Sequence, residues 1–230
     1  MAATTDPIVS FTGVSKQYGA LRPLRMDGLV LAPGDEVAVI GLDQPAAEVL
    51  ISLLTGAGLP DSGTVDLFGR PTSAIADSQE WLGLLDHFGI VSDRAALLEP
   101  MTALQNLSMP FTLDIEPPPA EIAAQAAALA REVGLDASLL DRRVGDLDPL
   151  SKLRVRLGRA VALNPSLLIL EHPSASLPRT DVVPFACDVR AVSARRRLAT
   201  LTLTADGELA GAISARALLL DLATGRLRRP

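Results

Sequence analysis

Hydrophobic and polar positions along this chain form short apolar runs in some stretches and helix-like repeats in others. The short runs predict strands near residues 7–11, 27–32, 37–41, 64–68, 88–92, 167–171, 199–204 and 216–222. Repeats with helical spacing predict helices at roughly 45–55, 78–86, 119–133 and 151–163. Strands dominate the first third, helices the middle, and the two alternate afterwards. This order predicts an α/β core with a helical insertion at about 93–155.

Composition narrows the class of protein. The chain has 230 residues, which is enough for one sizeable domain, and its 48% hydrophobic and 21% charged residues are typical of a packed protein. The net charge of −6 gives no sign of a nucleic-acid partner. Cys187 is the sole cysteine, which excludes an intrachain disulfide. No signal peptide is apparent, and no apolar run approaches the ~18 residues that span a bilayer. We therefore expect a soluble, cytoplasmic chain without direct membrane insertion.

The first candidate site follows the apolar strand at residues 37–41. A strand that runs through Gly41 into a short loop and a helix frames a phosphate-binding loop. In such a loop glycine amides wrap the phosphates, a lysine reaches the outer phosphates and a hydroxyl holds Mg²⁺. Counted from Gly41, these positions hold other residues: Gln44 and Ala46 for the glycines, Ala47 for the lysine, and Glu48 and Val49 for the hydroxyl. The frame is present without the phosphate-binding residues.

The same stretch also reads as an ordinary helix start. Asp43 suits a helix cap, Pro45 a first turn and Glu48 an early acidic position. Carboxylates can satisfy the partial positive charge of a helix N-terminus. Asp43 and Glu48 stand where a triphosphate would place its own charge, so we hypothesise that the protein fills its own anion site. On this basis we expect no cofactor and no metal, with ATP and Mg²⁺ relevant only if a nucleotide function survives.

Several ordered segments resemble the ATP-binding subunit of ABC transporters, over nearly the whole chain. These segments are 14–19, 53–56, 60–65, 68–69, 89–93, 101–107 and 167–173. Their spacing also agrees with the family, since Asp148 precedes Glu171 by 23 residues and His172 precedes Ala205 by 33. The resemblance implies a P-loop NTPase-like ABC ATPase fold over residues 1–230. Such a fold has a mixed sheet core, an N-terminal antiparallel β subdomain and a helical subdomain, here about 93–155.

The resemblance also implies a role for each matching position. In the family two subunits pair head to tail around ATP, and the following positions take part. Glu171 stands at the Walker B carboxylate that supports Mg²⁺, His172 at the general base, Asp93 at the Q-loop glutamine, Ala205 at the switch histidine, and Tyr18 at the aromatic that stacks on adenine. The signature motif Leu-Ser-Gly-Gly-Gln is replaced by Leu147, Asp148, Pro149, Leu150 and Ser151. We therefore expect no catalytic residue, and Glu171 is the one weak metal candidate.

Four of these residues have a plainer interpretation. His172 can in principle accept a proton, or it can simply face solvent at a strand end. Asp148 repels phosphate and Pro149 lacks an N–H, and together they suit the cap and first turn of a plain helix. Tyr18 either stacks on adenine or packs at a strand end.

Four functions remain open at this stage. We favour a pseudo-ATPase: a non-catalytic, membrane-associated ABC subunit, with a degenerate Walker A, that has lost hydrolysis and most ATP binding. It would bind a partner such as a membrane permease through residues 93–112, at the inner face of the cell membrane. The second function is one half of a heterodimer with residual ATP binding, whose partner is a second ABC ATPase. The others are a working ATPase with unusual residues and a stand-alone regulatory pseudo-ATPase, and a homodimer is a further option.

Overall fold

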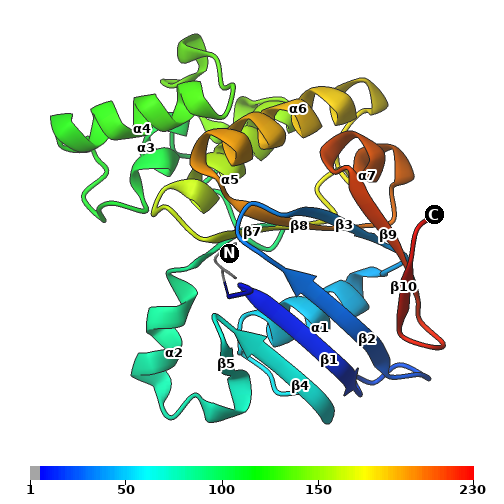
Figure 1. Cartoon of the computed structure of the whole chain (residues 1–230). Coiled ribbons are helices and arrows are strands. Elements are labelled where there is room, and N and C mark those ends of the chain that lie inside the picture. Colours follow the sequence, from blue (N-terminus) through cyan, green and yellow to red (C-terminus); the bar gives the residue numbers. More distant parts are fainter. Residues whose placement is uncertain (1–5) are drawn as a thin grey trace, which may run out of the picture.

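Two β-sheets of different construction lie on either side of helix α1 (Gln44–Leu54) in the computed structural model, which describes residues 6–230 (Figure 1). The first sheet is antiparallel, with the order β2-β1-β4-β5. Its strands come from the first third of the chain: β1 (Val9–Lys16), β2 (Leu24–Leu31), β4 (Ser62–Leu67) and β5 (Arg70–Pro71). This is the antiparallel β subdomain that the family resemblance implied.

The second sheet is mixed and has the order β10-β9-β3-β8-β7-β6. Its strands are β3 (Glu36–Ile40), β6 (Phe88–Val91), β7 (Leu167–Glu171), β8 (Ala199–Thr204), β9 (Arg216–Asp221) and β10 (Arg226–Arg228). All neighbours are parallel except β9 and β10, which form an antiparallel hairpin at one edge. Parallel strands place their carboxyl ends at one edge of the sheet, where ligands bind in open α/β folds.

Helices cover the other face of the mixed sheet, above it in Figure 1. They are α3 (Ala103–Ser108), α4 (Ala120–Glu132), α5 (Pro149–Val161), α6 (Arg179–Arg196) and α7 (Gly207–Ile213), while α2 (Ser78–Leu85) lies beside the antiparallel sheet. Successive residues of a strand point to opposite faces, which produces two cores. On β3, Ala38 joins the core under α3 to α7, whereas Val37 and Val39 join the core around α1.

The predicted elements overlap the observed ones, with boundaries shifted by a few residues. Every predicted strand and every predicted helix has a counterpart in the structure. Among the strands and α-helices of residues 6–230, five were not predicted: β5, β10, α3, α6 and α7. Helix α6 is the largest of these, and its buried positions have helical spacing, for example Val182, Phe185, Ala186 and Val189. Pro184 inside the helix and the arginines at its end interrupt that pattern in the sequence.

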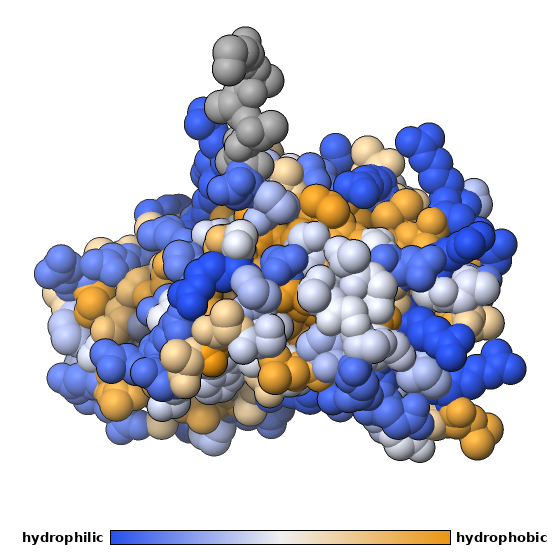
Figure 2. Space-filling model, turned by 60° about the horizontal axis from the view of Figure 1, so that its bottom comes forward, coloured by the Kyte–Doolittle hydropathy of each residue, from blue (hydrophilic) through white to orange (hydrophobic). Residues whose placement is uncertain are grey.

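The segment between β6 and β7 contains α3, α4 and α5, so the predicted helical insertion lies where it was expected. Helix α5 continues to Val161, beyond the predicted boundary near residue 155. Whether residues 93–155 form a separate subdomain within the 1–230 domain stays a prediction. Within residues 6–230, no helix combines the length and the hydrophobicity that crossing a bilayer requires. On the lower face of the molecule, hydrophobic and hydrophilic residues are interspersed (Figure 2).

Candidate functional site

The candidate site lies where the parallel strands β3, β7 and β6 end, beside the start of α1. Gly41 directly follows β3 and has a φ of 101°. An added Cβ there would lie 3.0 Å from the backbone oxygen of Leu220. The backbone at Gly41 therefore requires glycine for a local structural reason, since only glycine adopts this conformation without strain.

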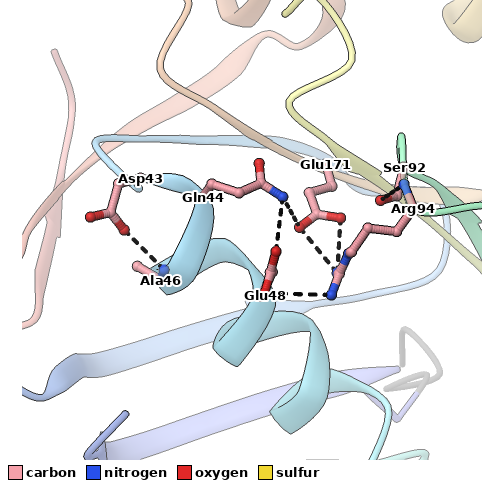
Figure 3. Close-up of polar contacts among 7 residues, drawn as sticks. All are labelled: Asp43, Gln44, Ala46, Glu48, Ser92, Arg94 and Glu171. Atoms are coloured by element: carbon pink, nitrogen blue, oxygen red, sulfur yellow. Dashed lines mark hydrogen bonds and ion pairs between the residues drawn. The ribbon is translucent and has the colours of Figure 1, made fainter. Parts of the chain in front are cut away.

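Helix α1 begins as the helix-start interpretation predicted. The Asp43 carboxylate accepts a hydrogen bond of 2.9 Å from the amide of Ala46, and Pro45 lies in the first turn (Figure 3). Both features are confirmed, although Glu48 lies beyond the first turn. Ala46 and Ala47, at the third glycine and lysine positions of the loop, are fully buried against the core.

Glu171, at the end of β7, is the centre of a polar network that also contains Gln44, Glu48 and Arg94 (Figure 3). Arg94 Nη2 donates to both carboxylate oxygens of Glu171, at 3.1 and 2.9 Å. Gln44 Nε2 donates to Glu171 Oε1 at 3.0 Å and to Glu48 Oε1 at 3.2 Å. Arg94 Nη1 lies 3.7 Å from Glu48 Oε2. We call these four residues the Glu171 network.

The Glu171 network explains how a carboxylate remains buried. The Glu171 side chain is only 1% exposed, and a buried carboxylate is costly unless it is paired and hydrogen-bonded. The guanidinium of Arg94, itself 51% exposed, supplies that pairing. A divalent cation at Glu171 would have to displace Arg94, and the neighbouring helix start offers no hydroxyl ligand at residues 48 and 49. In this arrangement the residues do not fit a Mg²⁺ ion.

Sequence reasoning missed Arg94. Asp93, the residue at the Q-loop position, points elsewhere and pairs with Arg156 at 3.0 Å. Its neighbour Arg94 reaches Glu171 instead, and the Arg94 amide is held by Ser92 Oγ at 3.1 Å. A signal was present, because β6 and β7 are adjacent parallel strands and their ends must meet. An arginine after one strand and a lone buried glutamate ending the other predict an ion pair.

His172 does not face solvent freely, so that interpretation is wrong. Its φ is 42°, in the left-handed region, and its amide donates to the Leu203 oxygen at 2.8 Å. Its Nε2 atom is buried and has no hydrogen-bond partner among the described residues. Ala205, at the switch position, lines the same shallow pocket and is exposed. The role of His172 as a general base stays a prediction.

The signature-motif positions form the start of α5, as the plain-helix interpretation predicted. Asp148 is the N-cap and accepts hydrogen bonds from the Ser151 amide at 2.9 Å and the Ser151 hydroxyl at 2.7 Å. Burial of the Asp148 carboxyl raises its pKa, but the hydrogen bonds from Ser151 and from the backbone of Asp148 and Leu150 together outweigh burial and hold the pKa below its usual value. Pro149 fills the first turn, and Leu150 packs against the helical core.

Tyr18 is half-buried and packs against the core around α1. Burial, and then the nearby charge of Asp43, raise the pKa of its hydroxyl. The packing interpretation is therefore confirmed, and the adenine-stacking role stays a prediction.

Comparison with curated proteins identifies relatives along nearly the whole chain. The lipoprotein-releasing system ATP-binding protein LolD of Pseudomonas syringae pv. tomato is 31% identical over 217 residues, which cover 94% of this chain and 93% of the relative. LolD of Psychrobacter arcticus is 29% identical over 93% of this chain and 95% of the relative. The methionine import ATP-binding protein MetN of Brucella abortus is 26% identical over 95% of this chain and 58% of the relative. No family model matches the chain.

Solved structures show the same fold. CbiO1 of Clostridium perfringens, part of the ABC transporter complex CbiONQ, matches 97% of this chain and 88% of its own with a TM-score of 0.81 and 19% identity. The dimeric bacterial ABC transporter cassette MJ0796 matches 96% of this chain and 97% of its own with a TM-score of 0.76 and 18% identity.

The relatives correct one expectation from the sequence. We expected no cofactor, but the curated relatives are named ATP-binding proteins. A further solved structure of MJ0796, with a TM-score of 0.74, holds ADP and Pi. The expectation of no cofactor is therefore wrong. It rested on replaced residues in the loop, at the signature motif and at Asp93, His172 and Ala205, and such replacements do not by themselves exclude a nucleotide.

Proposed function

Because this chain belongs to the family of ATP-binding subunits of ABC transporters, we propose that it is a non-catalytic member, which binds a transporter partner and does not hydrolyse ATP. The proposal concerns the hydrolysis step. The relatives are named as ATP-binding proteins, so ATP is the nucleotide with which this chain is tested.

The observation that carries the proposal is the contact of Arg94 with both carboxylate oxygens of Glu171. Hydrolysis in this family relies on the carboxylate at this position to support Mg²⁺. In this chain the Arg94 guanidinium contacts that carboxylate in place of the metal ion. Because the guanidinium neutralises the carboxylate, the carboxylate no longer supports a metal ion. Loss of one electrostatic interaction of this kind commonly costs about 10²-fold or more in rate.

The other positions of the site support the same proposal. Ala47 is buried where the phosphate-binding lysine would stand, and His172 occupies the general-base position in a strained backbone conformation. The amide of Ser151 is held by Asp148 at 2.9 Å, so the start of α5 presents a carboxylate where the family presents phosphate donors. Each of these changes removes an interaction that the family resemblance assigns to hydrolysis.

The partner under this proposal is a membrane permease, with the chain bound peripherally at the cytoplasmic face of the membrane. CbiO1 is described as part of a transporter complex, and MJ0796 forms a dimer. Residues 93–112 form the contact region that the resemblance assigned to a permease, and they include α3 with a complete capping box between Thr102 and Gln105. The second partner to consider is another ATP-binding subunit, or a second copy of this chain, in a head-to-tail pair.

An ATPase assay on the intact transporter complex tests the proposal. The complex is purified with this chain unaltered or carrying Glu171→Gln, and phosphate release is measured with Mg²⁺-ATP. We expect the same rate from both, because Glu171 makes no catalytic contribution. The control is binding of a fluorescent ATP analogue, which reports nucleotide association separately from turnover. A rate that falls when Glu171 is replaced would show that this chain hydrolyses ATP and would refute the proposal.

A further inference from the structure

A cavity of about 240 Å³ lies between helix α2 and the hairpin that β4 and β5 form. Leu67 at the end of β4, Ile75 after the hairpin and Leu84 on α2 give it apolar walls. The cavity reaches the mixed sheet at His87, just before the amino end of β6. None of its lining residues belongs to the candidate functional site, which lies at the carboxyl ends of the strands.

Helix α2 leaves much of its apolar surface uncovered. The helix lies at the edge of the molecule, beside β5 (Figure 1). Half of its eight residues are Trp or Leu, yet none of the eight, all of which the structure describes, is buried, and Leu82 is 57% exposed. Helices in proteins gain most of their stability by packing an apolar face. The cavity therefore marks a place where the described chain does not cover α2.

Phe68 stands at the cavity wall in a strained conformation. With Gly69 it forms the two-residue loop between β4 and β5, and the two residues have positive φ, 51° and 78°. Such loops favour Asn and Gly, because a bulky residue at positive φ is strained. The Phe68 ring contacts the His87 ring, with their centroids 4.8 Å apart. Strained residues cluster at binding sites, so this conformation favours a binding role for the Phe68 ring.

The polar residues of the lining define which ligands would fit. Its arginine and its glutamate, Arg70 and Glu80, pair with each other. Glu80 Oε2 also accepts a hydrogen bond of 2.9 Å from the Ala76 amide. An ionic ligand would therefore have to break this pair or remain unbalanced. Thr72, only 4% exposed, and His87 supply polar atoms for an uncharged group.

The volume of the cavity sets the size of its ligand. A dry protein cavity of about 150 Å³ binds benzene, and sites for drug-sized ligands have about 300–1,000 Å³. The value of about 240 Å³ lies between these limits. It suits a molecule of one or two fused rings.

We propose that this cavity binds a small, uncharged aromatic molecule of one or two fused rings with a single hydrogen-bonding group. The ring packs against Phe68 and His87, because aromatic rings attract one another beyond the burial of their area. Its apolar edge covers Leu84 of α2, and its polar group bonds to Thr72 or His87. The proposal does not depend on whether the chain hydrolyses ATP.

Nuclear magnetic resonance of the isotope-labelled full chain measures the binding. Trp81 is the sole tryptophan, so its indole N–H, which donates to the Thr55 oxygen at 3.0 Å, gives a single signal beside the cavity. The probe is 2-naphthol, which has two fused rings and one hydroxyl. We expect saturable shifts of the Trp81, Gly83 and Leu84 signals, with a Kd of about 1 mM or tighter.

Two further probes test the class of ligand. The first, 1-adamantanol, has as many carbon atoms as 2-naphthol and one hydroxyl, but no aromatic ring. The second, naphthalene-2-sulfonate, keeps the two rings and carries a negative charge. We expect each to bind about threefold more weakly than 2-naphthol, or weaker still.

Variants test the location. Gly83→Leu fills the cavity from α2, where an added Cβ meets no atom within 4 Å. Gly211→Leu is the matched control, because the Cβ at this glycine of α7 also meets no atom within 4 Å and Gly211 lies outside the cavity. We expect Gly83→Leu to abolish the saturable shifts and Gly211→Leu to keep them. His87→Ala should weaken binding of 2-naphthol about threefold or more, and His87→Phe, which keeps a ring, should weaken it less.

The possible outcomes separate clearly. Shifts that stay linear with the concentration of 2-naphthol, or a Gly83→Leu variant that binds it as tightly as the unaltered chain, would overturn the proposal. Equal binding of 1-adamantanol or of naphthalene-2-sulfonate would show that the class of ligand is wrong. Loss of binding in Gly83→Leu and in His87→Ala, with binding kept in Gly211→Leu, would support the proposal. None of these results depends on a permease or on ATP hydrolysis, so the proposed function is tested separately.

Discussion

Arg94 Nη2 donates to both carboxylate oxygens of Glu171, at 3.1 and 2.9 Å. The two residues are 77 positions apart in the chain. Arg94 follows β6, Glu171 ends β7, and these two strands are adjacent and parallel. The sheet thus brings a cation from one strand end to the buried anion at the other. This contact lies at the residue to which the family resemblance assigns the Walker B carboxylate.

Replacing Arg94 by Ala is expected to destabilise the fold. The change leaves the Glu171 carboxylate, 1% exposed, with Gln44 as its remaining donor. An unsatisfied buried polar group costs about 1–3 kcal/mol, and a charged one costs more. Urea unfolding followed by circular dichroism measures the loss. Lys16→Ala is the control, since its ion pair with Asp61 is exposed and contributes no more than about 1 kcal/mol. Equal losses for the two variants would mean that Arg94 does not stabilise Glu171.

Asp148 is expected to act as a helix cap. Asp148→Ala removes the acceptor for the Ser151 amide and is expected to lower the free energy of unfolding by about 1 kcal/mol. Asp148→Ser restores the residue type of the family's signature motif and keeps a cap, so it should cost only a few tenths of a kcal/mol. Thermal and urea unfolding compare the two. A serine variant as unstable as the alanine variant would argue against capping.

Glu132 is expected to make stability depend on acid. Hydrogen bonds from Arg196, one of 2.7 Å, lower its pKa, and burial opposes this shift. The folded pKa therefore lies below the unfolded value of about 4.3, so the stabilisation is present above that pH and is lost as the pH falls through the folded pKa. Glu132→Gln should flatten the fall in stability between about pH 5 and pH 3. Glu121→Gln, an exposed position on the same helix, should leave the profile unchanged.

Two glycines close in sequence are expected to respond oppositely to alanine. A Cβ at Gly89 would meet the Ala160 oxygen at 2.3 Å, so Gly89→Ala must separate β6 from α5 and should cost about 2 kcal/mol or more. Gly83 lies within α2 with no atom near the added Cβ, and there alanine should stabilise by about 0.5–1 kcal/mol. Differential scanning calorimetry measures both. A Gly89→Ala variant as stable as the unaltered chain would contradict the close approach of β6 and α5.

The sequence contained most of the fold because strands and capped helices are local patterns. β7 and β8 were predicted with their observed boundaries, and Asp43 and Asp148 were recognised as caps because a cap needs only its own first turn. Helix α6 was not predicted because Pro184 interrupts its hydrophobic pattern, although its buried residues have regular helical spacing. Local patterns also gave no sign of long-range ion pairs: Arg196, near the end of α6, is 17% exposed and pairs with Glu132.

The site was only half predictable, and for a physical reason. Residues were assigned to it one at a time from their positions, whereas the Glu171 network is a contact between strand ends that are distant in sequence. Arg94 occupies no motif position, so position matching could not find it. Pairing β6 with β7 first, and then asking which charged residues follow each strand, would have placed Arg94 beside Glu171.

The loop after β6 makes two long-range contacts from residues that are only two positions apart. Arg94 contacts Glu171, and the oxygen of Ala96, two residues later, accepts a hydrogen bond from Arg159. A substitution at Arg159 is therefore expected to affect the backbone beside Arg94, and a genetic screen should look for its second-site suppressors at positions 94 and 171.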